Sequence, residues 1–168
     1  TTDRDRFYVD KDNRLKMIDV EKTGPDIIVP EKVGDKVIYR ISLSSSYFSK
    51  INSIDISNVS ELEFFKLNLF EDSSCSKLKK LDFSKNKKLR SVITNRTKAL
   101  EEITFSENCK SISLYNTAVK KLDLKSAKKL KYFNYINGPL DNIDLSNNTN
   151  LEKVDIENTN IKSVDIKC

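Results

Sequence analysis

Residues 140–166 read LDNIDLSNNTNLEKVDIENTNIKSVDI, and this stretch decides the fold. An apolar-x-x-apolar-x-apolar unit starts at Leu140, starts again at Leu151, and begins a third time at Ile161. The last two apolar positions of each unit are two residues apart, which is the period of a β-strand. The stretch therefore predicts short strands that send alternate side chains inward and that repeat along the chain.

The same unit recurs through most of the chain in two alternating forms. The first form carries Asp after its second apolar residue, as in IDIS and LDFS, and it begins at 51, 78, 100, 119, 140 and 161. The second form begins at 62, 89, 109, 130 and 151. The true period is therefore two units. The longer interval between 51 and 78 indicates an insertion, NLFEDSSCSK, in a loop.

A single period of this kind cannot enclose a core, but stacked periods can bury a continuous one. Stacked coils would lie about 4.8 Å apart, which is the spacing of neighbouring strands. We therefore expect a β-rich solenoid of stacked coils with two short parallel strands in each coil. Cys109 occupies an inward position that leucine fills elsewhere, so we expect a small buried hydrophobic residue there.

Composition limits the function classes. The chain has 168 residues with no His and no Trp, and the absence of His removes the commonest general base and metal ligand. Its three cysteines fit no zinc motif. The net charge is +5, but the charges are interleaved along the chain and no compact basic patch with aromatic interleaving appears, so we expect no nucleic-acid partner. No apolar run reaches the roughly 20 residues of a membrane span. We expect no enzyme, no cofactor, no metal and no membrane insertion.

The repeats resemble the bacterial surface leucine-rich repeats of about 21 residues, and the resemblance extends over residues 51–168. The stretch DIIVPEKVGDKVIYRISLSSSYFSKINSIDIS (26–57) resembles the BspA-like subfamily, with its Ile-Val-Pro start, glycine turn and later Phe. The resemblance implies a β-rich leucine-rich-repeat solenoid. It also implies a cell-surface or secreted protein that binds host matrix proteins, other bacteria or glycans. The chain departs from the pattern at Cys109, where the unit is short, and at Thr94, which is polar at an inward position.

The two ends differ. Residues 1–50 are expected to form an N-terminal β-hairpin cap and the first coil, and residues 51–168 the solenoid, as one continuous domain. FYVDKDNRLKMIDV predicts two strands around a DKDN turn, and a second hairpin is expected around Gly34. We expect one helical turn in SSSYFSK (44–50). The sequence IKSVDIKC stops on a strand, so either the chain was cut from a longer array or this edge pairs with another copy in an end-to-end homodimer.

The two outward faces are expected to differ in chemistry. On the first face the central outward column is Asp55, Asp82, Thr104, Asp123, Asp144 and Asp165. We interpret these carboxylates as a solubilising ladder that also hydrogen-bonds turn groups, with calcium binding as the alternative. Asn residues after the strands, in SKN, SEN and SNN, are expected to satisfy backbone groups in turns.

The second face carries aromatic and aliphatic residues where solvent-facing strands normally place polar ones. Such residues beside Asn and Ser are typical of binding surfaces. We therefore predict a ligand-binding face formed by Phe64, Ile93, Ser113, Tyr115, Tyr132, Asn134 and Ile136. The alternative is that a loop, such as the insertion at 70–77, covers this face.

Three functions follow as hypotheses. The first is a non-enzymatic recognition or adhesion module at the cell surface or secreted, which binds a protein or extracellular-matrix component. The second is a structural spacer in a larger surface protein. The third is a carbohydrate-active parallel β-helix, in which neighbouring Asp residues of the column would act as a catalytic pair.

Overall fold

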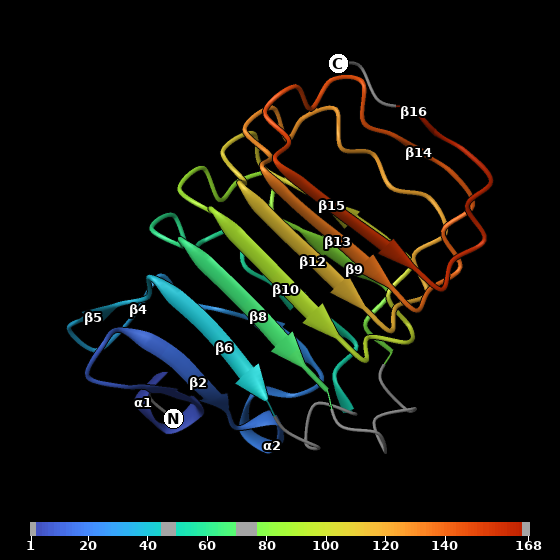
Figure 1. Ribbon diagram of the computed structural model, residues 1–168. Coiled ribbons are helices and arrows are strands. Elements are labelled where there is room, and N and C mark those ends of the chain that lie inside the picture. Colours follow the sequence, from blue (N-terminus) through green and yellow to red (C-terminus); the bar gives the residue numbers. More distant parts are fainter. Residues whose placement is uncertain (1–2, 45–49, 70–76, 166–168) are drawn as a thin grey trace.

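The computed structural model describes residues 3–44, 50–69 and 77–165, and in it the chain forms a β-solenoid of about six turns (Figure 1). Parallel strands stack from one turn to the next, and the described helices are two short ones, α1 (Asp3–Arg6) and α2 (Val20–Thr23). The prediction of stacked β-coils is confirmed.

One layer of the solenoid is an eight-stranded sheet, which we call the large sheet. In spatial order its strands are β1 (Phe7–Val9), β2 (Arg14–Ile18), β6 (Arg40–Ser44), β8 (Phe64–Asn68), β10 (Ser91–Asn95), β12 (Ser111–Tyr115), β13 (Tyr132–Ile136) and β15 (Lys153–Glu157). From β2 onward every neighbouring pair is parallel, and from β6 onward the register has no slip. Outward residues of successive coils therefore form straight columns across the sheet.

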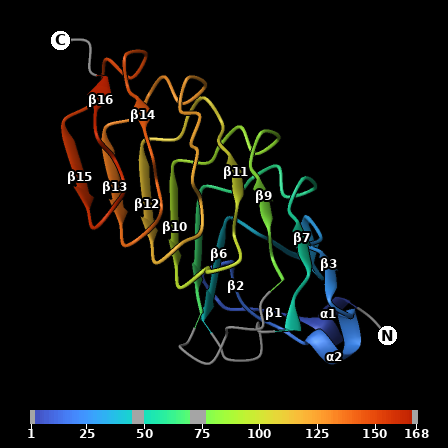
Figure 2. The same ribbon diagram turned by 90° about the vertical axis from the view of Figure 1, so that its right-hand side faces the viewer.

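The opposite layer is interrupted (Figure 2). It consists of three parallel pairs: β3 (Asp26–Ile28) with β7 (Ser53–Asp55), β9 (Lys80–Asp82) with β11 (Glu102–Thr104), and β14 (Ile143–Asp144) with β16 (Val164–Asp165). The prediction of two strands in every coil is wrong for the coil that begins at Val119, where residues 119–124 form no strand. Leu122 and Leu124 of this segment are still buried, so the coil keeps its inward packing without the strand ladder. This break adjoins the coil that is shortened at Cys109.

One hydrophobic core runs from Phe7 to Leu145 between the two layers. The inward positions of the repeat supply it, and stacked coils bring like residues together. The rings of Phe65 and Phe83 meet edge to face, with centroids 4.9 Å apart, and Phe83 and Phe105 stack at 6.4 Å. Aromatic pairs at such separations add to the burial of their area. The core explains why no single coil would be stable alone.

Two antiparallel strand pairs lie in the N-terminal part of the chain, at the positions expected for the two hairpins. β1 pairs antiparallel with β2 and is the last strand of the large sheet at this end. β4 (Lys32–Val33) pairs antiparallel with β5 (Lys36–Val37), and Gly34 between them has φ +64°, a conformation that glycine adopts readily. Of the helical turn predicted for residues 44–50, residues 45–49 lie outside the described residues, as does most of the insertion at 70–77.

Candidate functional site

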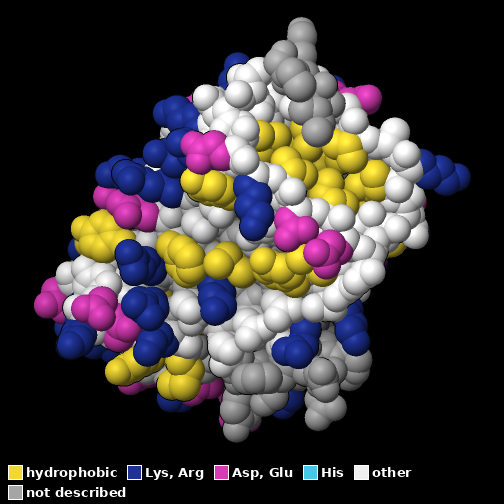
Figure 3. Space-filling model, viewed as in Figure 1, with side chains coloured by type: hydrophobic (Ala, Val, Ile, Leu, Met, Phe, Trp, Pro, Cys, Tyr) yellow, Lys and Arg dark blue, Asp and Glu magenta, His cyan; other side chains and the backbone are white. Residues whose placement is uncertain are grey.

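The outer side of the large sheet carries all seven residues of the predicted binding face. The columns follow from the register: Ile93, Ser113 and Asn134 lie opposite one another on successive strands, as do Tyr115 and Ile136. Phe64 and Tyr132 both lie in the column at the strand beginnings. Figure 3 shows hydrophobic side chains crossing this face between polar and basic ones.

The exposure of these residues is uneven. Tyr132 has 43% of its surface exposed, whereas most of the others are half-buried. Ser113 is only 6% exposed although it points outward, because its small side chain lies between the larger side chains of Ile93 and Asn134. The centre of the face, at Ser113, is therefore recessed, whereas the side chain of Tyr132 beside it is exposed to solvent.

Tyr132 is held in place by Glu152, the residue before β15, which also pairs with Lys131. Its hydroxyl donates a 2.6 Å hydrogen bond to Glu152, whose other carboxylate oxygen lies 2.5 Å from the ammonium group of Lys131. These contacts lower the pKa of Glu152, chiefly through the hydrogen bond from Lys131, and they raise the pKa of Tyr132. Tyr132 therefore presents a fixed, neutral aromatic ring at neutral pH.

A ladder of asparagine amides runs along the edge of the face at the strand ends. Asn95 donates to Asn68 at 3.0 Å, Asn116 to Asn95 at 2.9 Å, Asn137 to Asn116 at 3.3 Å, and Asn158 to Asn137 at 2.8 Å. Asn116, Asn137 and Asn158 have positive φ angles of 50–58°, which Asn tolerates better than most residues. Sequence reasoning missed this ladder, and we call it the outer Asn ladder.

The three asparagines predicted to satisfy turn groups each donate to backbone carbonyl oxygens of the preceding coil. Asn86 donates to the carbonyl oxygens of Ile56 and Val59, both at 2.9 Å, and Asn148 makes the equivalent pair of bonds to Leu124 and Ala127. Asn108 is different, because the corner in which it lies is two residues shorter. It is half-exposed and donates instead to the carbonyl oxygen of Lys87.

The acidic column of the opposite layer hydrogen-bonds turn groups, as predicted. In Asp55, Asp82, Asp123 and Asp144 the carboxylate accepts the backbone N–H two residues later, each time at 2.9 Å. The side chain and backbone of Ser146 lower the pKa of Asp144 through such bonds. Among the described residues no group of three or more His, Cys, Asp or Glu side chains is placed to hold a metal ion.

Basic side chains gather along the edge at which the strands of the large sheet begin (Figure 3, upper left). Arg90, Lys110 and Lys131 occupy equivalent positions in successive coils, since the backbone N–H of each later residue donates to the carbonyl oxygen of the one before it, at 2.8 Å. A depression of about 440 Å³ lies in this edge, lined by Lys87, Lys88, Arg90, Lys110 and Lys129 together with Asn108 and Glu63. Stacking thus brings together basic residues that the sequence separates by about 21 positions, although no aromatic residue is among the described residues that line the depression.

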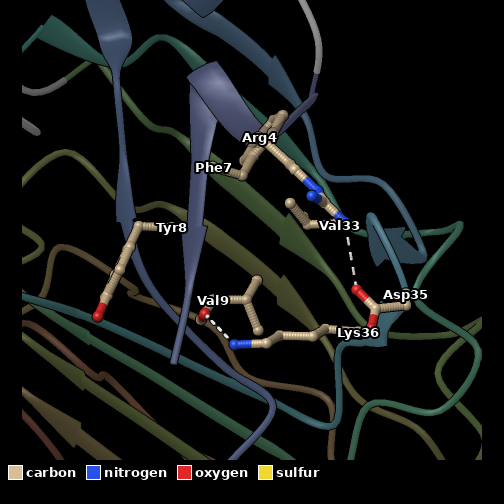
Figure 4. A pocket seen from close by; sticks show the side chains of 7 residues that line it. All are labelled: Arg4, Phe7, Tyr8, Val9, Val33, Asp35 and Lys36. Atoms are coloured by element: carbon tan, nitrogen blue, oxygen red, sulfur yellow. Dashed lines mark hydrogen bonds and ion pairs between the residues drawn. The ribbon is translucent and has the colours of Figure 1, made fainter. Parts of the chain in front are cut away.

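A second depression, of about 300 Å³, lies near the N-terminus (Figure 4). Its charged residues are engaged with the chain itself. Arg4 lies 3.3 Å from Asp35, and Lys36 donates to the carbonyl oxygens of Val9 and Asp10 at 3.1 and 3.0 Å. These contacts join the N-terminal hairpin to the β4–β5 turn, so the depression is a seam between packed segments.

At the other end of the solenoid the apolar interior reaches the surface. Val154 and Val164 are each 37% exposed, and Leu151, Ile156 and Ile161 are only partly buried against the core. Figure 3 shows the hydrophobic side chains of this end above the large sheet.

Fold and surface together define a β-solenoid with one continuous sheet, parallel from β2 onward, and a basic edge. The chain matches no family model, no curated protein and no solved structure. No helix in the described part of the chain is long and apolar enough to cross a membrane.

Proposed function

We propose that this protein is a non-enzymatic leucine-rich-repeat recognition module, of the BspA-like kind, that binds a protein or extracellular-matrix component through the outer side of the large sheet. The observation that carries the proposal is the arrangement of Phe64, Ile93, Tyr115, Tyr132 and Ile136 on the part of the sheet, from β6 onward, that has no register slip. Rigid aromatic side chains beside Ser and Asn give contact area at low cost in conformational entropy.

The rigidity of this face supports the proposal. Tyr132 is fixed by Glu152, Asn134 donates to Ser113 at 3.0 Å, and the outer Asn ladder ties the strand ends together. A surface whose side chains are already ordered loses less entropy when it binds a partner. A location at the cell surface or in the secreted fraction belongs to the same proposal.

The two other hypotheses gain less support. A carbohydrate-active β-helix would use the Asp column, but Asp55, Asp82, Asp123 and Asp144 all make the same bond to a turn. A catalytic pair instead needs two carboxyl groups whose environments separate their pKa values. The structural-spacer hypothesis predicts that outward residues of the large sheet can be replaced without loss of function.

The experiment compares the protein with a Tyr115→Glu, Tyr132→Glu double variant. The immobilised proteins are tested against a panel of purified extracellular-matrix proteins by surface plasmon resonance. The two introduced carboxylates would be buried in the contact with the partner. They should weaken the binding of a true partner by at least about a hundredfold, since hot-spot residues contribute about 2 kcal/mol or more each.

A matched control changes Tyr8→Glu and Met17→Glu. These residues are 55% and 59% exposed on the N-terminal hairpin of the same sheet. The control adds the same charge while leaving the proposed face intact, and circular dichroism checks all folds. A partner that both variants bind as well as the unchanged protein contradicts the proposed face, and the spacer then becomes the better hypothesis.

A further inference from the structure

The depression in the basic edge exists because one corner of the solenoid is short. Between the last apolar residue of the first unit (Phe83 or Leu124) and the first apolar residue of the second (Leu89 or Leu130), the coils of Leu78 and Val119 each place five residues, 84–88 and 125–129. The coil between them places three, residues 106–108. The outer corners each form two successive turns, whereas the middle corner forms one, closed by a bond from the Cys109 N–H to the Ser106 carbonyl oxygen at 3.2 Å. The middle corner is thus set back, and we call the resulting depression the notch.

The side chains around the notch are strongly cationic. Five Lys and Arg residues line it, against the single carboxylate of Glu63. Lys88 is paired with Glu61 at 2.7 Å, but neither Arg90 nor Lys110 forms an ion pair with a described residue. Both are exposed and occupy adjacent rungs, so their charges repel each other at a spacing of about 5 Å.

Cations on other columns of the solenoid are arranged differently. Lys79 pairs with Glu101 of the next coil at 3.5 Å, and Lys80 pairs with Glu102 at 3.4 Å. Along the row of Arg90, Lys110 and Lys131, acidic residues stand at the two ends, as Glu63 before Arg90 and Glu152 after Lys131. The centre of the row is left positive, and a bound anion would relieve the repulsion.

We propose that the notch binds a sulfate group of a linear sulfated polysaccharide that lies along the solenoid axis. Arg90 and Lys110 contact the sulfate, and Lys129 closes the notch from the next coil. Three stacked coils offer cations over about 10 Å, a length that suits one or two sulfated sugars. Arg binds such planar or tetrahedral oxyanion edges through two parallel N–H donors.

The remaining lining distinguishes a sugar from a nucleic acid. The Asn108 amide donates to Lys87 at 2.8 Å, while its oxygen accepts from Lys129 at 2.6 Å, and Glu63 supplies a carboxylate. Amide and carboxylate groups suit sugar hydroxyls, which alternate with sulfates along such a polymer. The described lining has no aromatic side chain on which a base would stack, and stacking supplies much of the affinity for single strands. This site is independent of the proposed protein-binding face.

The test measures the affinity of the full chain for a fluorescent heparin octasaccharide by anisotropy. The probe is compared with the same octasaccharide after chemical desulfation and with single-stranded DNA of equal charge. We expect binding of the sulfated probe only. The Arg90→Gln, Lys110→Gln variant should bind it at least about tenfold more weakly.

Two further variants separate the notch from net charge. Lys120→Gln with Lys121→Gln removes the same charge from exposed lysines of the opposite layer and should keep the affinity unchanged. A Gly-Ser insertion after Glu107 keeps every charge but restores the corner to five residues, and it should weaken binding as strongly as the notch variant. Equal loss in the Lys120, Lys121 control, full binding after the insertion, absence of binding to the sulfated probe, or equal binding of the DNA would each overturn the proposal.

Discussion

The hydroxyl of Tyr135 donates a 2.6 Å hydrogen bond to the carbonyl oxygen of Val119, across the interior of the solenoid. Tyr135 has no exposed surface, and burial raises the pKa of its hydroxyl to about 12. Gly138 covers the same hydroxyl so closely that any Cβ there would lie 2.3 Å from it. The bond is therefore a buried polar contact that ties β13 to the opposite layer, just where that layer has no strand.

Replacing Tyr135 with Phe should destabilise the protein by about 1–3 kcal/mol, because the Val119 carbonyl is left without its partner in a buried position. Urea unfolding followed by circular dichroism measures the change. Tyr132→Phe is the matched control, since it also removes one tyrosine hydroxyl bond but at an exposed position. It should change the free energy of unfolding by less than about 0.5 kcal/mol. Equal losses in the two variants would contradict this role of Tyr135.

The outer Asn ladder should contribute to stability through its central member. Asn116 makes two ladder bonds, and Asn116→Gly removes both while keeping a residue that tolerates its φ of 50°. We expect a loss of about 1–2 kcal/mol in the free energy of unfolding.

Asn13→Gly provides the comparison for the ladder. Asn13 has a similar φ of 57° in the β1–β2 turn, but it lies outside the ladder. Its replacement should be nearly neutral in the same urea titration. If both glycine variants lose the same stability, backbone freedom rather than the ladder accounts for the effect.

The Asp column predicts a specific dependence on pH. Hydrogen bonds from the side chain and backbone of Ser146 hold the pKa of Asp144 below its ordinary value of 3.8. The folded state therefore prefers the ionised form, so the contribution of Asp144 is fully present above pH 3.8 and is lost as the pH falls through the lowered pKa. Asp144→Asn should be less stable than the unchanged protein at pH 7, and the difference should shrink below pH 3.8.

Asp141→Asn is the control for this titration, since it replaces an exposed Asp of the same coil. Unfolding midpoints in urea from pH 7 to pH 2.5 give the comparison. A stability difference for Asp144→Asn that stays constant across this range would show that the ionised carboxylate makes no special contribution.

Cys109 should be unreactive in the folded protein. It is fully buried in the place of a leucine, and burial raises the pKa of its thiol to about 12, so almost no thiolate forms near pH 8. In a Cys75→Ser, Cys168→Ser background, iodoacetamide should label the protein only in denaturant, as mass spectrometry would detect. Rapid labelling in buffer alone would place the thiol at the surface.

The periodicity of the sequence predicted the parts of the fold that depend on burial. Leu81 and Phe83 are two residues apart and both inward, and Asp82 between them faces outward. The same alternation predicted which residues share the outer side of the large sheet. It could not predict the low exposure of Ser113, which depends on the sizes of its neighbours on adjacent strands.

Other features were missed because they arise only when coils are stacked. The outer Asn ladder changes position between Asn95, the last residue of β10, and Asn116, which follows β12. No fixed spacing within the repeat therefore reveals it. The short unit at Cys109 was visible in the sequence. That it leaves a notch between Lys87 and Lys129 could not be predicted, because the sequence does not show that the corners carrying these lysines lie on either side of it.

The outer Asn ladder also bears on how such a protein can change its length. Every amide in it donates toward the N-terminal end and accepts from the C-terminal end, so each coil needs only the same amide above and below. Duplication or loss of a complete coil would remake the bonds at the junction, whereas a change by half a coil would break them. The ladder thus favours evolution of this solenoid by gain or loss of whole coils. Each added coil would keep the same direction of hydrogen bonding.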